Sequence, residues 1–241
     1  MRIAYLDCSS GVSGDMLLAA LLDAGIEIAD LRKVLAKLDI SGYSISVKKV
    51  RKGALLVSRL EVRITRHQHF RSYQDIKSII QNSRISPAVK ITAIKILRKL
   101  GQTEAKVHKC RLEEVHFHEI GAVDTIIDIV GTVWALSRLK IGKIYSSPVN
   151  VGSGTVRTAH GILPVPAPAT AALLKNIPTY SSGIKQELAT PTGAVLVSTL
   201  SHSFGHLPEM RVLAVGNSCG SREVPGHANL FRVIIGQKGK K

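Results

Sequence analysis

Residues Tyr5 to Gly25, YLDCSSGVSGDMLLAALLDAG, predict a strand, a loop of small residues and a buried helix in succession. The apolar run at 3–6 is typical of a buried strand, and the small residues of CSSGVSG are typical of a loop. From Asp15 the segment is apolar nearly all round, which is the pattern of a helix buried on every side. Gly25 suits the left-handed cap that often ends a helix. This unit is the first of several in which a helix follows a strand.

Strands and helices alternate along the rest of the chain. Helices are expected at about 29–38, after a Ser72–Asp75 capping box, at 87–101, 102–111 and 122–140, within PVPAPATAALL, and from TPTG to about 203. Strands are expected at 43–50, 54–65, 144–151, 210–215 and 229–235. We therefore expect one α/β (or α+β) domain over residues 1–241, a mixed sheet with flanking helices and a small β-hairpin appendage at 43–66.

Composition limits the function classes. The formal net charge is +16, from 33 Lys and Arg against 17 Asp and Glu, which favours anionic ligands. Nucleic acid is disfavoured, because the basic residues are dispersed and the aromatic content is only 4%. Three widely separated cysteines suggest neither a disulfide framework nor a zinc knuckle, so a reducing cytoplasm is expected. No apolar run is long enough to span a membrane and no leader is evident.

Histidines and carboxylates gather in VHFHEIGAVDTIIDIVG, residues 115–131. In an extended strand His116 and His118 share one face, which is the spacing of a two-histidine metal site, and Glu119 follows them. Helical periodicity after Gly121 places Asp124 and Asp128 on one face, one turn apart. Polar decoration of a half-buried strand is the alternative reading of the histidines, and the aspartates could simply solvate their helix.

Two glycine loops could bind an anion. The loop CSSGVSG leads into a helix N-terminus, where backbone amides favour phosphate or carboxylate, although it lacks the Lys-Ser/Thr of a P-loop. Asp7 could hold a metal or a hydroxyl group, and Cys8 could be a thiolate favoured by the helix or a buried thiol in a tight turn. The second loop, GSGTVRTAHG at 152–161, offers amides and an imidazole. A further pair, His67 and His69, either gathers metal or is solvated.

Four segments in order along the chain resemble the nickel-insertion protein of lactate racemase maturation, the LarC family. They are YLDCSSGVSGDMLLAALLDAG, VHFHEIGAVDTIIDIVG, HGILPVPAPATAALL and ELATPTGA. The resemblance implies a cytoplasmic nickel chelatase, a lyase that inserts Ni(II) into pyridinium-3,5-bisthiocarboxylic acid mononucleotide to form the nickel-pincer cofactor. It also implies that the reaction consumes CTP and that CTP is bound with a divalent metal ion, Mg or Mn.

The chain departs from the family pattern in two places. Family members often carry a long histidine-rich run where this chain has only His67-Gln68-His69. The family also has a C-terminal domain associated with CTP, whereas this chain stops at GQKGKK. Two alternatives follow: a separate C-terminal subunit supplies that part, or the present chain is a truncated or inactive relative. A homo-oligomer is also left open.

The patterns and the resemblance together give a candidate site. Expected metal ligands are His116, His118 and Glu119, with a second pair at His67 and His69. Expected catalytic or positioning groups are Asp7, Cys8 and Asp15. Expected substrate-binding residues are Gly11, Gly14, Gly152, Gly154 and His160. The alternatives are a nickel metallochaperone without chelatase activity and a metal-dependent hydrolase that holds water on the same cluster.

Overall fold

A mixed sheet of seven strands organises the chain. The computed structural model describes residues 1–66, 71–115, 117, 122–223 and 227–239. The strand order is β2-β3-β10-β11-β1-β4-β9. The bounds of these strands are β1 (Arg2–Asp7), β2 (Tyr43–Lys52), β3 (Leu55–Ile64), β4 (Ile141–Ser146), β9 (Ser203–Phe204), β10 (Arg211–Cys219) and β11 (Leu230–Gln237). β1 pairs in parallel with β4 and antiparallel with β11, so the predicted mixed α/β sheet is confirmed.

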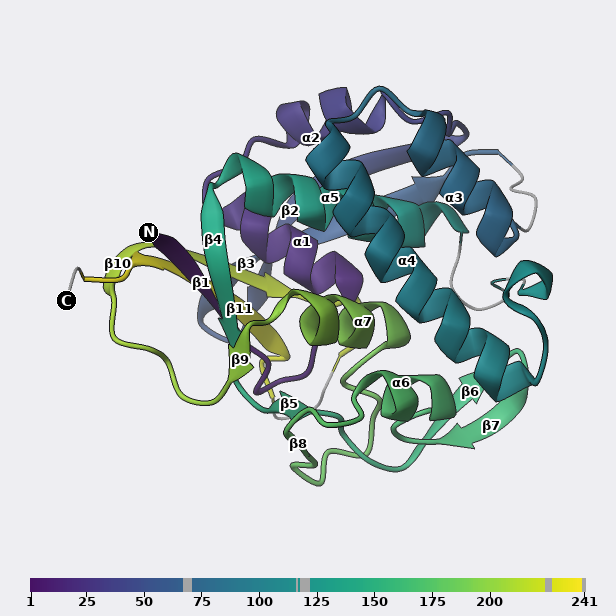
Figure 1. Cartoon of the computed structure of the whole chain (residues 1–241). Coiled ribbons are helices and arrows are strands. Elements are labelled where there is room, and N and C mark those ends of the chain that lie inside the picture. Colours follow the sequence, from purple (N-terminus) through teal and green to yellow (C-terminus); the bar gives the residue numbers. More distant parts are fainter. Residues whose placement is uncertain (67–70, 116, 118–121, 224–226, 240–241) are drawn as a thin grey trace.

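Helices cover the sheet in successive layers. Their bounds are α1 (Gly14–Asp23), α2 (Ile28–Leu35), α3 (Tyr73–Asn82), α4 (Pro87–His108), α5 (Ala122–Arg138), α6 (Pro168–Leu173) and α7 (Pro191–Leu200). α1 lies between the sheet, where it contacts β3, β10 and β11, and the helix α5, while α4 packs over α5 and α7 (Figure 1). This position explains why α1 is apolar on every side, as its sequence predicts.

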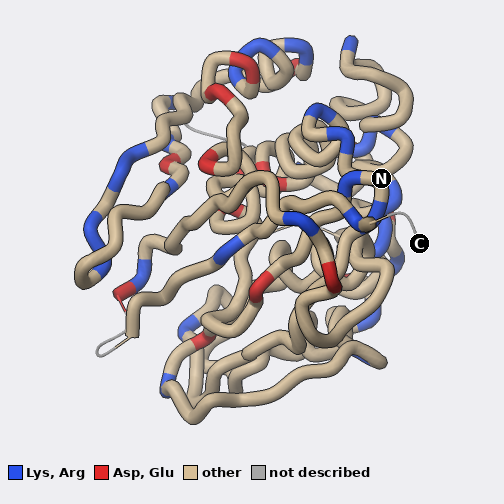
Figure 2. Tube along the Cα trace, turned by 90° about the vertical axis from the view of Figure 1, so that its left-hand side faces the viewer, with Lys and Arg blue, Asp and Glu red and all other residues tan. Residues whose placement is uncertain are grey.

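The predicted hairpin forms, and it extends the main sheet. β2 and β3 pair from Tyr43↔Ile64 to Lys52↔Leu55. β3 in turn pairs with β10 through Ser58 and Ser218, so the hairpin makes up the edge of the seven-stranded sheet. Lys and Arg are spread over this hairpin and many other elements (Figure 2).

The second glycine loop is more ordered than predicted. It contains β6 (Thr155–Thr158) and β7 (Gly161–Pro164), which pair as a small antiparallel hairpin. A second small sheet joins β5 (Val149–Asn150) to β8 (Thr179–Tyr180). The predicted strand at 144–151 is therefore divided between β4 and β5, and the chain bends between them.

Two other predictions about elements differ from the structure. One helix, α4, runs without interruption through Gly101. The position requires glycine because a Cβ there would lie 2.8 Å from Leu112 and 3.0 Å from Tyr73. Gly101 thus serves close packing and does not end the helix. An extended strand was expected around His116 and His118, but the neighbouring Val115 and Phe117, which are buried, do not belong to a strand. Within the described residues, no helix has the length and apolar character needed to cross a membrane.

Candidate functional site

A cleft of about 910 Å³ lies where the N-terminal ends of three helices converge. The first turn of α1 contributes 13–15, the first turns of α5 contribute Asp124, Thr125 and Asp128, and the start of α7 contributes 190–192. β3, the β6 strand, Glu187 and Arg222 complete the wall. Unpaired amides at helix N-termini carry partial positive charge, so three of them around one cleft favour an anionic ligand.

The floor of the cleft is acidic. Asp128 is only 8% exposed, and its Oδ1 has no hydrogen-bond partner in the described structure. Burial, followed by the charges of Asp15 and Asp124, raises the pKa of Asp128 well above its usual range. Burial and the charge of Asp15 also raise the pKa of Asp124. The floor therefore favours a cation or a bound proton that would relieve the repulsion.

A glycine makes room for this carboxylate. A Cβ at Gly14 would lie 2.2 Å from Oδ2 of Asp128, a distance that no side chain tolerates. Gly14 is the first residue of α1, so its lack of a side chain lets the helix start directly beside Asp128. Gly14 therefore serves close packing beside the cleft, and its role in substrate binding stays a prediction.

Arginines line the rim. Arg63 on β3 and Arg157 on β6 both line the cleft and are exposed, and neither side chain has an ion-pair or hydrogen-bond partner among the described residues. Arg222 lies nearby and pairs with Glu187 at 3.2 Å. The sequence analysis missed all of these residues. Exposed arginines on alternating strands look like ordinary solvated side chains, and only the fold brings β3 opposite β6.

Two of the other predicted glycines, Gly11 and Gly152, serve close packing. Gly11 has φ +89°, its amide donates to the carbonyl of Cys8, and a Cβ would lie 2.1 Å from the Leu188 carbonyl oxygen. Gly152 donates to Asn150 Oδ1 at 3.2 Å and lies against Gln186. Gly154 lies in the same loop with φ +81°. None of these three residues lines the cleft.

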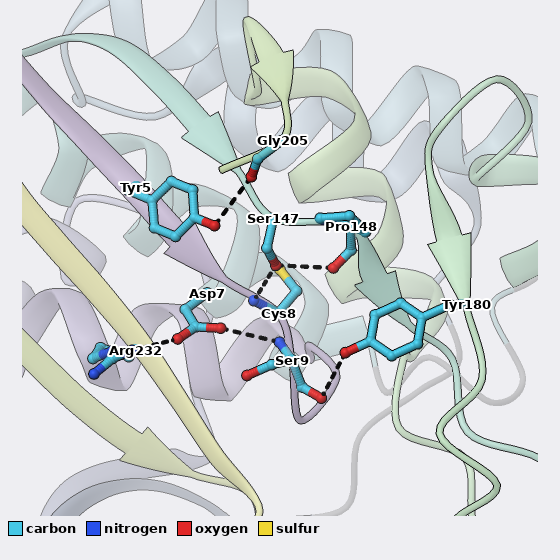
Figure 3. Close-up of polar contacts among 9 residues, drawn as sticks. All are labelled: Tyr5, Asp7, Cys8, Ser9, Ser147, Pro148, Tyr180, Gly205 and Arg232. Carbon is cyan, nitrogen blue, oxygen red and sulfur yellow. Dashed lines mark hydrogen bonds and ion pairs between the residues drawn. The ribbon is translucent and has the colours of Figure 1, made fainter. Parts of the chain in front are cut away.

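Asp7 and Cys8 do not line the cleft, and their polar contacts are with other residues (Figure 3). Asp7 accepts from Arg232 Nη2 at 2.7 Å and from the Ser9 amide at 3.2 Å. Burial raises the pKa of Asp7, but the hydrogen bonds from Ser9 and Arg232 outweigh it and the net shift is downward. Asp7 is thus ionised and already paired.

Cys8 does not have the thiolate character that its position suggested. Its side chain is fully buried, its amide donates to Ser147 Oγ at 2.9 Å, and its Sγ lies 3.5 Å from Ser146 Oγ (Figure 3). Burial raises the pKa of the Cys8 thiol to about 12, which the helix N-terminus does not offset. The structure thus shows the alternative, a buried thiol in a tight turn.

Of the remaining predicted site residues, one lines the cleft, one lies at an exposed turn and five lie outside the described residues. Asp15 lines the cleft, and its carboxylate accepts from the Ser13 hydroxyl. His160 lies at the exposed turn between β6 and β7, with its ring 4.8 Å from that of His108. Predicted ligands outside the described residues are His67, His69, His116, His118 and Glu119. Within the described part of the chain, no three His, Cys, Asp or Glu side chains are grouped to enclose a metal ion.

The sequence model of one family, described as nickel insertion protein, matches residues 4–241. The chain belongs to the nickel insertion protein family. A relative from Geotalea uraniireducens that carries this family name is 47% identical over 240 residues, which is 99% of the chain and 62% of the relative.

Two further members of the family have names that state a substrate. A protein of Desulfitobacterium hafniense (strain DSM 10664 / DCB-2) is named pyridinium-3,5-bisthiocarboxylic acid mononucleotide nickel insertion protein and is 45% identical, over 98% of the chain and 59% of the relative. A protein of Geobacillus kaustophilus has the same name and is 42% identical, over 99% of the chain and 60% of the relative. The chain spans about three fifths of the length of these curated relatives. No solved structure matches it.

The four segments that carry the family resemblance all reach the cleft. Asp15 comes from the first segment, Asp124 and Asp128 from the second, Ala167 from the third and Thr190 from the fourth. The first and fourth segments are held together by backbone hydrogen bonds, from the Val12 amide to the Leu188 carbonyl at 2.9 Å and from the Thr190 amide to the Val12 carbonyl at 3.0 Å. The cleft is therefore the candidate site of the family's chemistry.

Proposed function

We propose that this chain inserts Ni(II) into pyridinium-3,5-bisthiocarboxylic acid mononucleotide and that the cleft holds the mononucleotide during insertion. The observation that carries the proposal is the meeting of all four family segments at one cleft with an acidic floor and a basic rim. The mononucleotide combines a phosphate and two thiocarboxylates, all anionic. Three helix N-termini with the unpaired Arg63 and Arg157 are suited to such a molecule.

Nickel is the cargo of the reaction, and we assign its ligands to the segment that precedes α5. Imidazole is a preferred nickel ligand, and the sequence places His116, His118 and Glu119 a few residues before Asp124. His67 and His69 are a second candidate pair. Within the cleft, Asp15 is the predicted catalytic residue whose position suits the role, since Asp7 is paired and Cys8 is buried.

The remaining part of the function is assigned outside this chain. The relatives extend well beyond the matched region, and we place the use of CTP with Mg or Mn in that additional part. A cytoplasmic location fits the three free cysteines among the described residues.

Nickel titration by calorimetry tests the ligand assignment. The double variant His116→Ala/His118→Ala should lose at least about tenfold in nickel affinity, because each imidazole supplies a nitrogen ligand. The matched control, His202→Ala/His206→Ala, removes two exposed imidazoles that do not line the cleft and should bind nickel as the wild type does. Unchanged affinity in the first variant would exclude these histidines from the nickel site.

A further inference from the structure

The carboxylate of Asp128, which is buried, differs from the partly buried carboxylate of Asp23. Asp23 accepts hydrogen bonds from Ser58 Oγ at 2.7 Å and from the Asn217 amide at 2.8 Å, and it also pairs with Lys49. Asp128 is at least as buried, yet its Oδ1 has no donor in the described structure. A carboxylate with a purely structural role would be hydrogen-bonded or paired, because an unpartnered buried charge is costly.

The groups nearest Asp128 make its isolation more costly. Asp15 from α1 and Asp124 from its own helix are the charged groups that perturb it, and both are acidic. The other basic residues of the cleft, Arg63 and Arg157, lie on different elements, β3 and β6, and Arg222 is paired with Glu187. Hydroxyl groups of Ser13, Thr125 and Thr192 also line the cleft. The groups around Asp128 that could coordinate a cation are therefore all oxygen atoms.

Oxygen ligands select a particular class of cation. Carboxylates, hydroxyls and water suit Mg²⁺ and Mn²⁺, whereas nickel prefers the nitrogen of imidazole. Mg²⁺ keeps several waters and is bound through one or two carboxylates together with substrate phosphate oxygens. Such an ion needs no closed cage of protein ligands, which agrees with the absence of one among the described residues. The cleft, at about 910 Å³, has room for a hydrated ion and a substrate.

We propose that Asp124 and Asp128, with Asp15 beside them, bind an oxygen-preferring divalent cation of the Mg²⁺ class, separate from the nickel site. The cation joins the acidic floor to the phosphate of the bound substrate, whose other oxygens face Arg63 and Arg157. Gly14 lets the first turn of α1, and with it Asp15, lie directly against Asp128, since a Cβ there would be 2.2 Å from Oδ2 of Asp128. The role of the phosphate rests on the proposed function, whereas binding of the cation itself does not.

Binding of Mn²⁺, followed by electron paramagnetic resonance, tests the proposal. The wild type should bind one Mn²⁺, and Asp128→Asn and Asp124→Asn should each weaken it by at least about tenfold. Asp39→Asn removes an exposed carboxylate outside the cleft and should change nothing. Thermal unfolding should show Asp128→Asn to be folded and no less stable than the wild type, because the change removes a buried, repelled charge. Wild-type Mn²⁺ affinity in both cleft variants would overturn the proposal.

Two further readings separate this site from the nickel site. The Mn²⁺ spectrum should lack nitrogen coupling, and the His116→Ala/His118→Ala variant should keep its Mn²⁺ while losing nickel. Nitrogen coupling, or displacement of all Mn²⁺ by one equivalent of nickel, would show a single shared site and overturn the proposal. Addition of the mononucleotide should tighten Mn²⁺ binding and add phosphorus coupling. If it does neither, the bridging role fails, even where nickel binding through the histidines stands.

Discussion

At the level of single residues, the environment of a side chain decides its chemistry more than its place in a motif does. Cys8 follows a strand and precedes a helix N-terminus, which is the setting of many reactive thiols. In the structure the surrounding core removes water from the sulfur, and desolvation outweighs any effect of the helix. Asp128 shows the converse, because a residue that could merely solvate its helix is instead buried without a partner at the floor of the cleft.

The thiols of the native protein should react unequally. Cys8 and Cys219 are buried, whereas Cys110 is partly exposed. In native protein at pH 8, a thiol reagent such as DTNB should therefore label one cysteine rapidly, and the Cys110→Ser variant should remain almost unlabelled until denaturant is added. Since the pKa of Cys8 is about 12, raising the pH to 9 should not change this. Rapid labelling of native Cys110→Ser would contradict the buried thiol.

At the level of elements, side chains at helix ends tie the layers together. The start of α1 meets α5 through Gly14 and Asp128, and the start of α7 meets the first loop where a Cβ on Gly193 would lie 2.2 Å from the Val12 carbonyl oxygen. At the other end of α1, Asp23 joins the helix to β3, β10 and β2 through Ser58, Asn217 and Lys49. These contacts fix α1 at both ends, which fixes the position of the cleft.

The anchor at Asp23 should contribute a stability that depends on pH. Burial raises the pKa of Asp23, but hydrogen bonds from the Asn217 amide, Lys49 and Ser58 outweigh it, so the net pKa is lower than that of an ordinary aspartate. Because the folded pKa is depressed, the contribution is complete above the ordinary carboxyl pKa and is lost as pH falls through the lowered value. Asp23→Asn should therefore reduce the free energy of unfolding by about 2 kcal/mol at pH 7, since it leaves donors without an ionised acceptor.

Denaturant unfolding from pH 7 down to pH 3 provides the check. The difference between the wild type and Asp23→Asn should shrink as the solution becomes acidic, whereas Asp39→Asn should show almost no difference throughout. If the difference in the free energy of unfolding stayed constant with pH, the negative charge of Asp23 would contribute nothing to stability.

At the level of the whole molecule, the sequence predicted the local elements better than their assembly. Periodicity and capping residues located α1, α3, α5 and the β2–β3 hairpin, because these signals depend on neighbours a few residues apart. Gly101 gave a false end to a helix, because its reason for being glycine is Tyr73, which lies on another helix. The β6–β7 hairpin was not predicted, because its segment is rich in glycine and polar residues and lacks the alternating apolar pattern of a strand.

The candidate site shows the same division. Asp15 and Gly14 were predicted from a loop that runs directly into a helix, and both reach the cleft. Arg63 and Arg157 were not predicted. They lie 94 positions apart in the sequence, and only the main sheet and the small β6–β7 hairpin bring both to the rim of the cleft. Residues whose chemistry depends on a partner distant in the sequence are the ones that local patterns miss.

Binding of pyridinium-3,5-bisthiocarboxylic acid mononucleotide to the cleft tests the central claim most directly. Calorimetric titration should show that Arg157→Ala and Arg63→Ala each weaken binding by about tenfold, because each removes an unpaired cation from the rim. Arg51→Ala is the matched control, since Arg51 is exposed on the same hairpin as Arg63 but does not line the cleft. The affinity loss should diminish as ionic strength rises. Equal affinity in the wild type and both rim variants would place the substrate elsewhere and contradict the account.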